Sequence, residues 1–204
     1  GKYRNLLVAA TGTGKTVVSA FDYKYFCQNR PKEVNRLLFI AHREEILKQS
    51  IDCFRMVLKD QNFGDLWVGE YQSSQIDHLF MSIQTFNSKE FEKFTTPDFY
   101  DFIIVDEFHH SAAPSYEKLL AYYKPKILLG LTATPERMDG QDILKYFDYR
   151  IAAEIRLSEA IDRKLLSPFQ YFGVTDSVDL SRLRWSRGGY DINELENVYT
   201  ENTQ

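Results

Sequence analysis

A glycine-rich segment of the chain contains the residue types that hold nucleotide phosphates. Residues 9–16 read Ala-Ala-Thr-Gly-Thr-Gly-Lys-Thr and lie between an apolar run and a segment of helix length. The glycines let backbone N–H groups turn toward phosphate oxygens, and the helix start adds partial positive charge. Lys15 would reach the β and γ phosphates, and Thr16 would hold Mg²⁺. The predicted phosphate-binding residues are Thr11, Gly12, Thr13, Gly14, Lys15 and Thr16.

Two adjacent carboxylates follow another apolar run and could complete this chemistry. Residues 102–105 lead directly into Asp106 and Glu107. The end of a buried strand is where a second Mg²⁺-holding group is expected. We assign Asp106 to Mg²⁺, mostly through water, and Glu107 to the water that attacks the γ-phosphate, because a carboxylate beside a metal ligand can accept its proton. Together, the loop and the carboxylate pair predict hydrolysis of ATP with Mg²⁺ as cofactor.

The histidine pair and the two cysteines are candidate metal ligands. His109 and His110 are adjacent, whereas the helical zinc motif requires two histidines four residues apart, so the zinc interpretation is disfavoured. Cys27 and Cys53 lack the paired spacings of a zinc site or a disulfide framework. This pattern predicts reduced thiols in an intracellular protein, and we expect a cytoplasmic one.

The elements that would position these residues alternate along the chain. Apolar runs with the length of buried strands lie at residues 5–10, 36–41, 78–83, 102–105 and 126–131. Segments with the length of helices lie at residues 15–28, 43–59 and 115–123. The alternation predicts an α/β fold with a mostly parallel sheet and helices on both of its faces. Ligands of such sheets bind where the carboxyl ends of the strands meet, and the candidate residues fall there.

The pattern becomes looser after Pro135. We expect helices near residues 141–147 and 158–163, and a last strand at residues 169–174. Residues 1–174 are therefore assigned to one nucleotide-binding domain. Residues 175–204 are polar and contain Gly188 and Gly189, which predicts a connector followed by a short helix at residues 192–199.

Composition limits the classes of protein that fit the chain. With 44% hydrophobic and 26% charged residues, the chain lies outside the low-hydrophobicity range of disordered proteins. Its apolar runs are too short to cross a bilayer, so no membrane contact is expected. The net charge of -4 gives no global attraction for nucleic-acid phosphates, so nucleic-acid binding would depend on local groups.

In their order along the chain, these segments resemble the motifs of superfamily 2 helicases of the DEAD/DEAH-like type, specifically the first RecA-like lobe, a P-loop NTPase lobe. Residues 9–16 resemble motif I, with Ala9 where the general pattern has glycine. Residues 106–110 resemble the Asp-Glu-x-His box, in which His109 would couple the nucleotide site to the next motif, whereas His110 would be a supporting or capping residue. The remaining assignments implied by the resemblance are motif III at Thr132, Ala133 and Thr134, motif Ia at His42 and Arg43, and motif Ib at Gln84 and Thr85.

The motif III hydroxyls would link hydrolysis to movement of two lobes, and motifs Ia and Ib would contact the nucleic-acid backbone. An ordinary charged helix start is the alternative for His42 and Arg43. Within the superfamily, residues 106–110, 132–137 and 159–168 look most like the helicase subunits of type I and type III restriction enzymes.

The resemblance implies an ATP-dependent helicase that moves on or unwinds nucleic acid, with DNA favoured over RNA. A duplex-DNA translocase of a restriction or repair system, which moves without unwinding, is one alternative. A nucleotide-switched binding module is another, although Lys15, Thr16, Asp106 and Glu107 are all intact. Some members attach nuclease-like domains, which makes such a domain a candidate partner.

Relatives carry an adenine-reading segment before the position of Gly1 and a second RecA-like lobe with arginine fingers after the connector. Because loss of such a finger costs about 10³ to 10⁵ in turnover, we expect the isolated chain to hydrolyse ATP barely above background. The connector also interleaves cations with an aromatic residue, as strand-binding grooves do, at Arg182, Arg184, Trp185 and Arg187. Flanking aspartates favour packing against the second lobe over contact with a strand.

Overall fold

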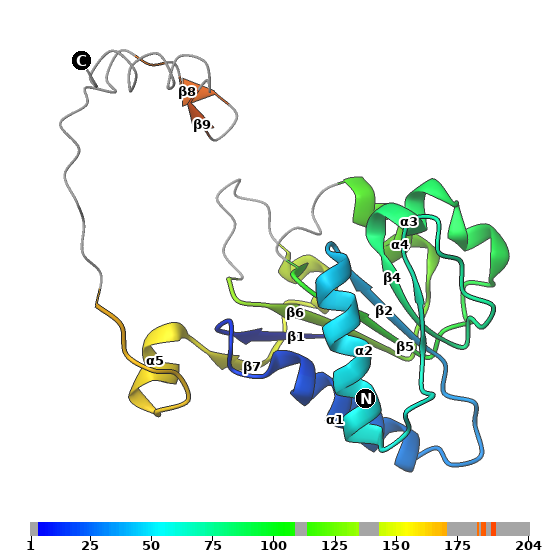
Figure 1. Cartoon of the computed structure of the whole chain (residues 1–204), viewed down its shortest axis with the longest axis horizontal. Coiled ribbons are helices and arrows are strands. Elements are labelled where there is room, and N and C mark those ends of the chain that lie inside the picture. Colours follow the sequence, from blue (N-terminus) through cyan, green and yellow to red (C-terminus); the bar gives the residue numbers. More distant parts are fainter. Residues whose placement is uncertain are drawn as a thin grey trace. The chain divides into compact units, whose positions relative to one another are not determined.

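A parallel sheet forms the centre of the molecule in the computed structural model, which describes residues 4–108, 114–134, 143–170, 183, 185–186 and 189–190. The chain divides into two compact units, residues 1–167 and 168–204. The sheet of the first unit has seven strands in the order β3-β4-β2-β5-β6-β1-β7 (Figure 1). Its strands are β1 (Arg4–Ala9), β2 (Leu37–Ala41), β3 (Asp65–Trp67), β4 (His78–Ser82), β5 (Phe102–Val105), β6 (Ile127–Thr132) and β7 (Ile151–Ile155). Every neighbouring pair is parallel.

The central strands are buried at almost every residue because helices cover both faces of the sheet. All residues of β2 and β5 are buried, and both strands consist of apolar residues. Continuous apolar runs of this kind are typical of parallel strands with two covered faces. The register pairs Ile40 with Val105 and Val105 with Gly130. The strand ends therefore lie level, and the residues that follow them meet at one edge of the sheet.

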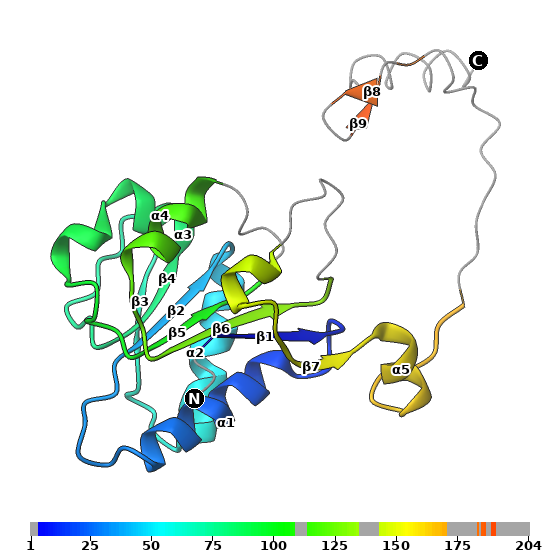
Figure 2. The same ribbon diagram turned by 180° about the vertical axis from the view of Figure 1, so that it is seen from behind.

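Helices α1 (Lys15–Gln28) and α2 (Glu44–Leu58) cover one face. Their buried side chains share one apolar cluster with the alternate strand residues Leu37, Phe39 and Ala41. The other face is covered by α3 (Ile83–Ser88), α4 (Pro114–Tyr122) and the 3-10 helices η1 (Phe91–Phe94) and η3 (Leu144–Phe147). Strand residues Leu38 and Ile40 belong to the cluster on that side. Figures 1 and 2 show the two layers from opposite sides.

The first unit also contains α5 (Leu157–Asp162), which follows the edge strand β7. In the second unit, β8 (Trp185–Ser186) and β9 (Gly189–Tyr190) form an antiparallel pair. No helix within the described ranges is long and apolar enough to span a bilayer.

The structure confirms the predicted α/β fold, the mostly parallel sheet and the helices on both faces. The five predicted strands and the three predicted central helices are present, with ends that shift by at most one residue. Several short elements were not predicted, among them the 3-10 helix η1 (Phe91–Phe94) and the strands β8 and β9. Strand β3 has only three residues, β7 is an exposed edge strand without apolar alternation, and α3 begins inside a run that had been assigned wholly to a strand.

Other predictions need correction. The helix expected at residues 141–147 is a 3-10 helix at Leu144–Phe147. A strand was expected over residues 169–174. Residues 169 and 170 are not in a strand, and residues 171–174 lie outside the described residues. The described contacts divide the chain after Ser167, and the domain boundary expected after residue 174 stays a prediction. The helix predicted at residues 192–199 also lies outside the described residues.

Candidate nucleotide-binding site

The predicted phosphate-binding loop follows β1 and extends into the first turn of α1, which begins at Lys15. Gly12 and Gly14 have φ angles of 90° and 86°, a left-handed region that side chains other than glycine rarely adopt. The Thr13 backbone N–H donates to the Ala10 carbonyl at 3.2 Å, and the Thr13 hydroxyl donates to the same oxygen at 2.7 Å. The two glycines therefore allow a tight turn at the amino end of α1, as phosphate binding requires.

Lys15 lies over this turn and near the carboxylate pair. Its ammonium Nζ donates to the Ala9 carbonyl at 3.0 Å and lies 3.5 Å from the Ala10 carbonyl oxygen. Burial lowers the pKa of Lys15, and the charges of Asp106 and Glu107 counteract part of that effect. The lysine is therefore held by two strand-end carbonyls within the electrostatic reach of both carboxylates.

Asp106 is buried at the end of β5, with 6% of its surface exposed. Its backbone N–H donates to the Ile40 carbonyl at 2.8 Å, and its Oδ1 accepts the Glu107 backbone N–H at 2.8 Å. Burial raises the pKa of Asp106, whereas the Glu107 N–H bond and the charge of Lys15 act in the opposite direction. Glu107 has a φ of 53°, in the left-handed region, which non-glycine residues adopt mainly where the surroundings impose it.

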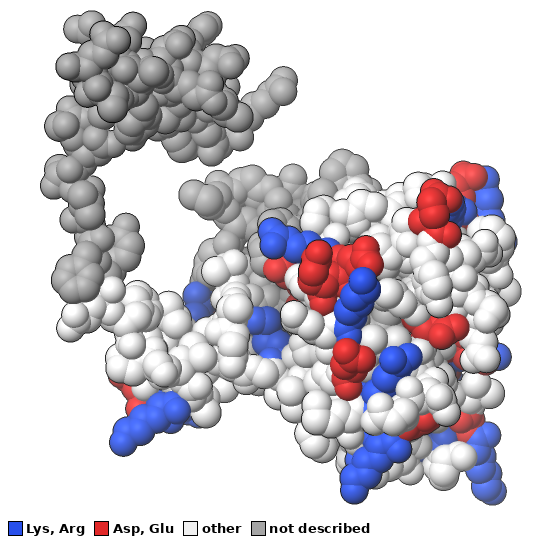
Figure 3. Space-filling model, viewed as in Figure 1, with Lys and Arg blue, Asp and Glu red and all other residues white. Residues whose placement is uncertain are grey.

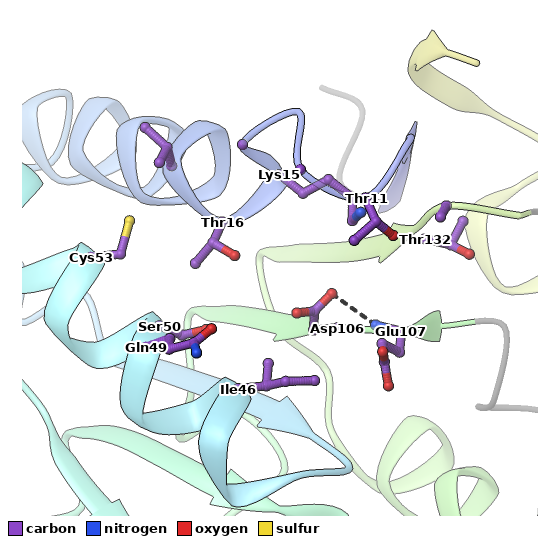
Figure 4. A pocket seen from close by; sticks show the side chains of 14 residues that line it. Thr11, Lys15, Thr16, Ile46, Gln49, Ser50, Cys53, Asp106, Glu107 and Thr132 are labelled. Carbon is purple, nitrogen blue, oxygen red and sulfur yellow. Dashed lines mark hydrogen bonds between the residues drawn. The ribbon is translucent and has the colours of Figure 1, made fainter. Parts of the chain in front are cut away.

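A cavity of about 420 Å³ joins these groups, a volume within the range of small-molecule sites. One wall is the loop with the start of α1, and a second wall is the end of β5 with the end of β6. The third wall is one face of α2. Figure 4 shows Thr16 and Asp106 facing each other across the cavity. The lining residues are Thr11, Gly12, Gly14, Lys15, Thr16, Val17, Ile46, Gln49, Ser50, Cys53, Asp106, Glu107, Thr132 and Ala133.

The α2 wall was not predicted from the sequence. The sequence showed no signal for nucleotide binding at Ile46, Gln49, Ser50 or Cys53. All four line the cavity, and their spacing of three, four and seven residues from Ile46 places them on one face of a helix. That spacing was visible in the sequence, but only the fold shows that this face of α2 meets the phosphate loop.

The donor set fits a magnesium ion. The hydroxyl of Thr16 and the carboxylate of Asp106 face each other across the cavity (Figure 4), and Mg²⁺ prefers oxygen ligands. It also retains several water ligands. The polar side chains of Gln49 and Ser50 line the same cavity and could accept or donate hydrogen bonds to such waters.

The residues assigned to motif III lie beside the same cavity. Thr132 is fully buried at the end of β6, where its hydroxyl donates to the Thr134 carbonyl at 3.0 Å and accepts the Thr134 N–H at 3.2 Å. Thr132 and Ala133 line the cavity, whereas Thr134 is exposed outside it. The first two residues therefore border the space that an occupant of the cavity would fill.

The predicted nucleic-acid residues follow the ends of β2 and β4, which are neighbours in the sheet. His42 and Arg43 lie between β2 and α2, and Gln84 and Thr85 lie in α3. His42, Arg43 and Gln84 are exposed. The Gln84 amide Nε2 lies 3.0 Å from His42 Nδ1 and 3.2 Å from Nε2. On the face shown in Figure 3, acidic and basic side chains of the described residues are interspersed, without a continuous basic patch.

Thr85 needs correction as a predicted nucleic-acid contact. Only 3% of its surface is exposed. Its hydroxyl oxygen accepts the Gly69 N–H at 3.0 Å and the Ser82 hydroxyl at 2.8 Å. Its N–H donates to the Ser82 hydroxyl at 3.1 Å, which caps the first turn of α3. The Thr85 side chain therefore stabilises α3 and is not available to an external phosphate.

Several predicted residues lie outside the described ranges, namely His109, His110, Arg182, Arg184 and Arg187. Trp185 is described only as a residue of β8. Cys27 and Cys53 are free cysteines.

A phosphate loop between a parallel strand and a helix faces the carboxylate pair two strands away, in which Asp106 is buried. This arrangement defines a P-loop NTPase lobe of the RecA-like class. Residues 1–137 match the family described as type III restriction enzyme, res subunit. This match covers more than half of the chain, so the chain belongs to that family.

Individual relatives agree with this family. The chain is 30% identical over 206 residues to the type I restriction enzyme EcoAI endonuclease subunit of Escherichia coli, an alignment that covers 95% of this chain and 24% of that protein. It is 28% identical over 200 residues to the Saccharomyces cerevisiae protein named "Putative ATP-dependent helicase IRC3", covering 93% of this chain and 28% of that protein. The chain thus spans about a quarter of the length of these relatives.

The fold is also similar to a solved structure of a nuclease-deletion mutant of the type ISP restriction-modification enzyme LlaGI in complex with a DNA substrate mimic. The TM-score is 0.60 at 21% sequence identity, and the similarity covers 80% of this chain and 19% of that one. At this identity, the likeness supports the fold alone.

Proposed function

We propose that the chain is the ATP-binding lobe of an ATP-dependent helicase that uses hydrolysis to move on or unwind DNA. One observation carries this proposal: Lys15 and Thr16 share a cavity with Asp106 and Glu107. A phosphate-binding group, a magnesium-binding pair and a candidate proton acceptor therefore meet in one place. The name of the yeast relative as an ATP-dependent helicase supports ATP as the nucleotide.

Each residue of the cavity has a defined part in the proposed hydrolysis. The loop N–H groups and the Lys15 ammonium bind the β and γ phosphates. Thr16 and Asp106 hold Mg²⁺, which neutralises charge on the phosphate oxygens when bound. Glu107 accepts the proton of the attacking water as the water oxygen bonds to the γ-phosphorus and the bond to the β-phosphate oxygen breaks. Thr132 and Ala133 would transmit the change to a second lobe of the full-length protein, and His109 is proposed to do the same.

DNA is the proposed track, and RNA is the alternative. His42, Arg43 and Gln84 are exposed at two adjacent strand ends and could hold backbone phosphates. The EcoAI relative is a restriction-enzyme subunit, which favours DNA. A second RecA-like lobe and a nuclease-like domain are proposed as further parts of the full-length protein.

The proposal is tested with the full-length protein by measuring ATP turnover and strand displacement. Single-stranded DNA, duplex DNA and RNA are compared in parallel at one stated salt concentration, because phosphate contacts depend on salt. Lys15→Ala should abolish both activities, whereas Lys32→Ala, which changes an exposed lysine outside the cavity, should preserve them. Retained activity in Lys15→Ala would overturn the assignment of the site.

The same experiment separates the alternatives. Triplex displacement on duplex DNA without strand separation would identify a translocase. Nucleotide-dependent DNA affinity without ATP turnover would identify a binding switch.

A further inference from the structure

Leu166, near the end of the first unit, contacts the phosphate loop. A Cβ placed on Gly12 would lie 3.1 Å from Leu166 Cδ2, so the leucine side chain packs against the backbone of the first loop glycine. Apart from the chain neighbours of Gly12, no other atom of the described residues comes within 4 Å of that position. Gly12 lines the nucleotide cavity and Leu166 does not. The leucine therefore supports the loop from outside the cavity.

Burial along the chain distinguishes Leu166 from the residues around it. Residues 162–165 and 167–170 are exposed, and Leu166 between them is partly buried. The neighbouring Leu165 has the same side chain but is 53% exposed. Of the two adjacent leucines, Leu166 is therefore the one that packs on Gly12.

The turn after α5 fixes the direction of this side chain. The Lys164 N–H donates to the Ile161 carbonyl at 2.9 Å, and the Leu165 N–H donates to the Ala160 carbonyl at 2.9 Å. Lys164 has a φ of 59°, and this pair of bonds with a left-handed residue is a common way to end a helix. The Leu166 N–H also donates to the Ala160 carbonyl, at 3.1 Å. Because Ala160 is fully buried, the turn that presents Leu166 is anchored in the fold.

Strand β7 brings this turn to the phosphate loop. It pairs in parallel with β1, from which the loop starts, and the register matches Ala9 with Ile155. The pairing continues by one bond into the loop, because the Ala10 N–H donates to the Ile155 carbonyl at 3.0 Å. Helix α5 follows β7 at this edge of the sheet (Figures 1 and 2). The loop is therefore held at Ala10 by the strand and at Gly12 by the leucine.

The phosphate loop benefits from such support because its glycines restrict it so little. Gly12 and Gly14 can populate many backbone conformations, and ordering a mobile loop on binding lowers affinity. Within the loop, the Thr13 N–H and hydroxyl both donate to the Ala10 carbonyl. These bonds fix the turn but leave Gly12 without a side chain of its own to pack. The contact with Leu166 supplies that packing from a distant part of the chain.

We propose that Leu166 is a positioning residue for nucleotide binding, whose side chain holds the phosphate loop at Gly12 in the conformation that accepts the phosphates. This role rests on the proposed function, because it takes MgATP as the ligand of the loop. Residues 1–137 match the family, so the positioning residue lies beyond the matched segment. Because Leu166 lies outside the cavity that contains the reacting groups, it should set the affinity for MgATP and leave the rate of hydrolysis unchanged.

The test measures MgATP affinity and ATP turnover in the full-length protein. Leu166→Ala removes the contact, and Leu166→Met keeps a side chain of similar volume. Leu166→Ala should raise the Kd for MgATP about tenfold, the effect of a loop that is competent to bind about a tenth of the time. Its turnover at saturating MgATP and DNA should stay within about twofold. Leu166→Met and the matched control Leu165→Ala should keep both quantities within about twofold.

Hydrogen exchange in the nucleotide-free protein separates loop positioning from general destabilisation. Leu166→Ala should speed exchange of the backbone amides in residues 9–16. Exchange in residues 37–41 of β2, which are fully buried, should stay unchanged. A variant that is merely less stable would expose both segments. It would also lower turnover through loss of folded protein, with an unchanged Kd in the molecules that remain folded.

The outcomes separate the positioning role from the proposed function. If the unmodified protein binds and hydrolyses MgATP but Leu166→Ala keeps either its Kd or its loop exchange unchanged, the positioning role is wrong and the proposed function stands. A loss of turnover without a change in Kd, or equal acceleration of exchange in both segments, would also overturn the role. If the unmodified protein does not bind MgATP, the proposed function fails and the role in nucleotide binding fails with it.

Discussion

Gly130 in β6 is predicted to tolerate no side chain, although its backbone conformation is ordinary for a strand. A Cβ at this position would collide with Phe147 Cζ and would lie 2.9 Å from Leu6 Cδ1 and 3.1 Å from Phe108 Cδ2. Phe147 cannot easily move away, because it is fully buried and its ring packs against Phe108 with 4.6 Å between the centroids. Gly130→Ala should therefore cost about 1–3 kcal/mol, as is usual for added methyl groups in a close-packed core.

For a domain of this size, such a loss lowers the melting temperature by about 2–4 °C per kcal/mol. Urea and thermal unfolding of the full-length protein measure the change. Phe147→Leu should restore part of the loss in the double variant, because it shortens the side chain that the new methyl group meets. Gly69→Ala serves as the comparison, since its Cβ would meet nothing within 4 Å but its φ is 57°. An undiminished melting temperature in Gly130→Ala, or equal rescue of Gly69→Ala by Phe147→Leu, would refute the steric reasoning.

Two further predictions concern the cavity. Asp106→Asn should raise the melting temperature of the nucleotide-free protein at neutral pH while abolishing ATP turnover, because burial raises the pKa of Asp106 and makes its ionised form costly. The stability of the unmodified protein should fall as pH rises through that raised pKa. The higher melting temperature of Asp106→Asn should therefore vanish below the ordinary pKa of aspartate. A higher melting temperature of the variant that persists there would contradict this account. MgATP should slow maleimide labelling of Cys53, which lines the cavity. It should not slow labelling of Cys27, which lies outside the cavity lining. Equal labelling rates of Cys53 with and without MgATP would place the nucleotide elsewhere. Because burial raises the pKa of both thiols, both labelling rates should keep rising above the ordinary thiol pKa.

The sequence predicted the groups whose chemistry is local. Residues 9–16 carry their own conformational requirement in Gly12 and Gly14, and Asp106 follows an uninterrupted apolar strand. Such signals are complete within a few residues. The fold class followed in the same way from the alternation of apolar runs and helix-length segments.

Features that depend on tertiary contacts were beyond the sequence. Ser50 and Cys53 line the cavity only because α2 packs beside α1 on the same face of the sheet. Thr85 and Gln84 are adjacent, yet the start of α3 buries the first and exposes the second. Strand β7 (Ile151–Ile155) is a short run of mostly apolar residues that lies exposed at the sheet edge, and its pairing with β1 alone defines it.

The most direct test of the central claim is the combined measurement of MgATP affinity and ATP turnover in Glu107→Gln, in the full-length protein with saturating DNA. The account predicts affinity within about twofold of the unmodified protein and turnover lower by about 10² to 10⁴, the contribution of a general base. Glu117→Gln, which changes an exposed carboxylate of α4, should leave both quantities unchanged. Undiminished turnover in Glu107→Gln would show that the cavity between the phosphate loop and the carboxylate pair does not hydrolyse ATP in the proposed way.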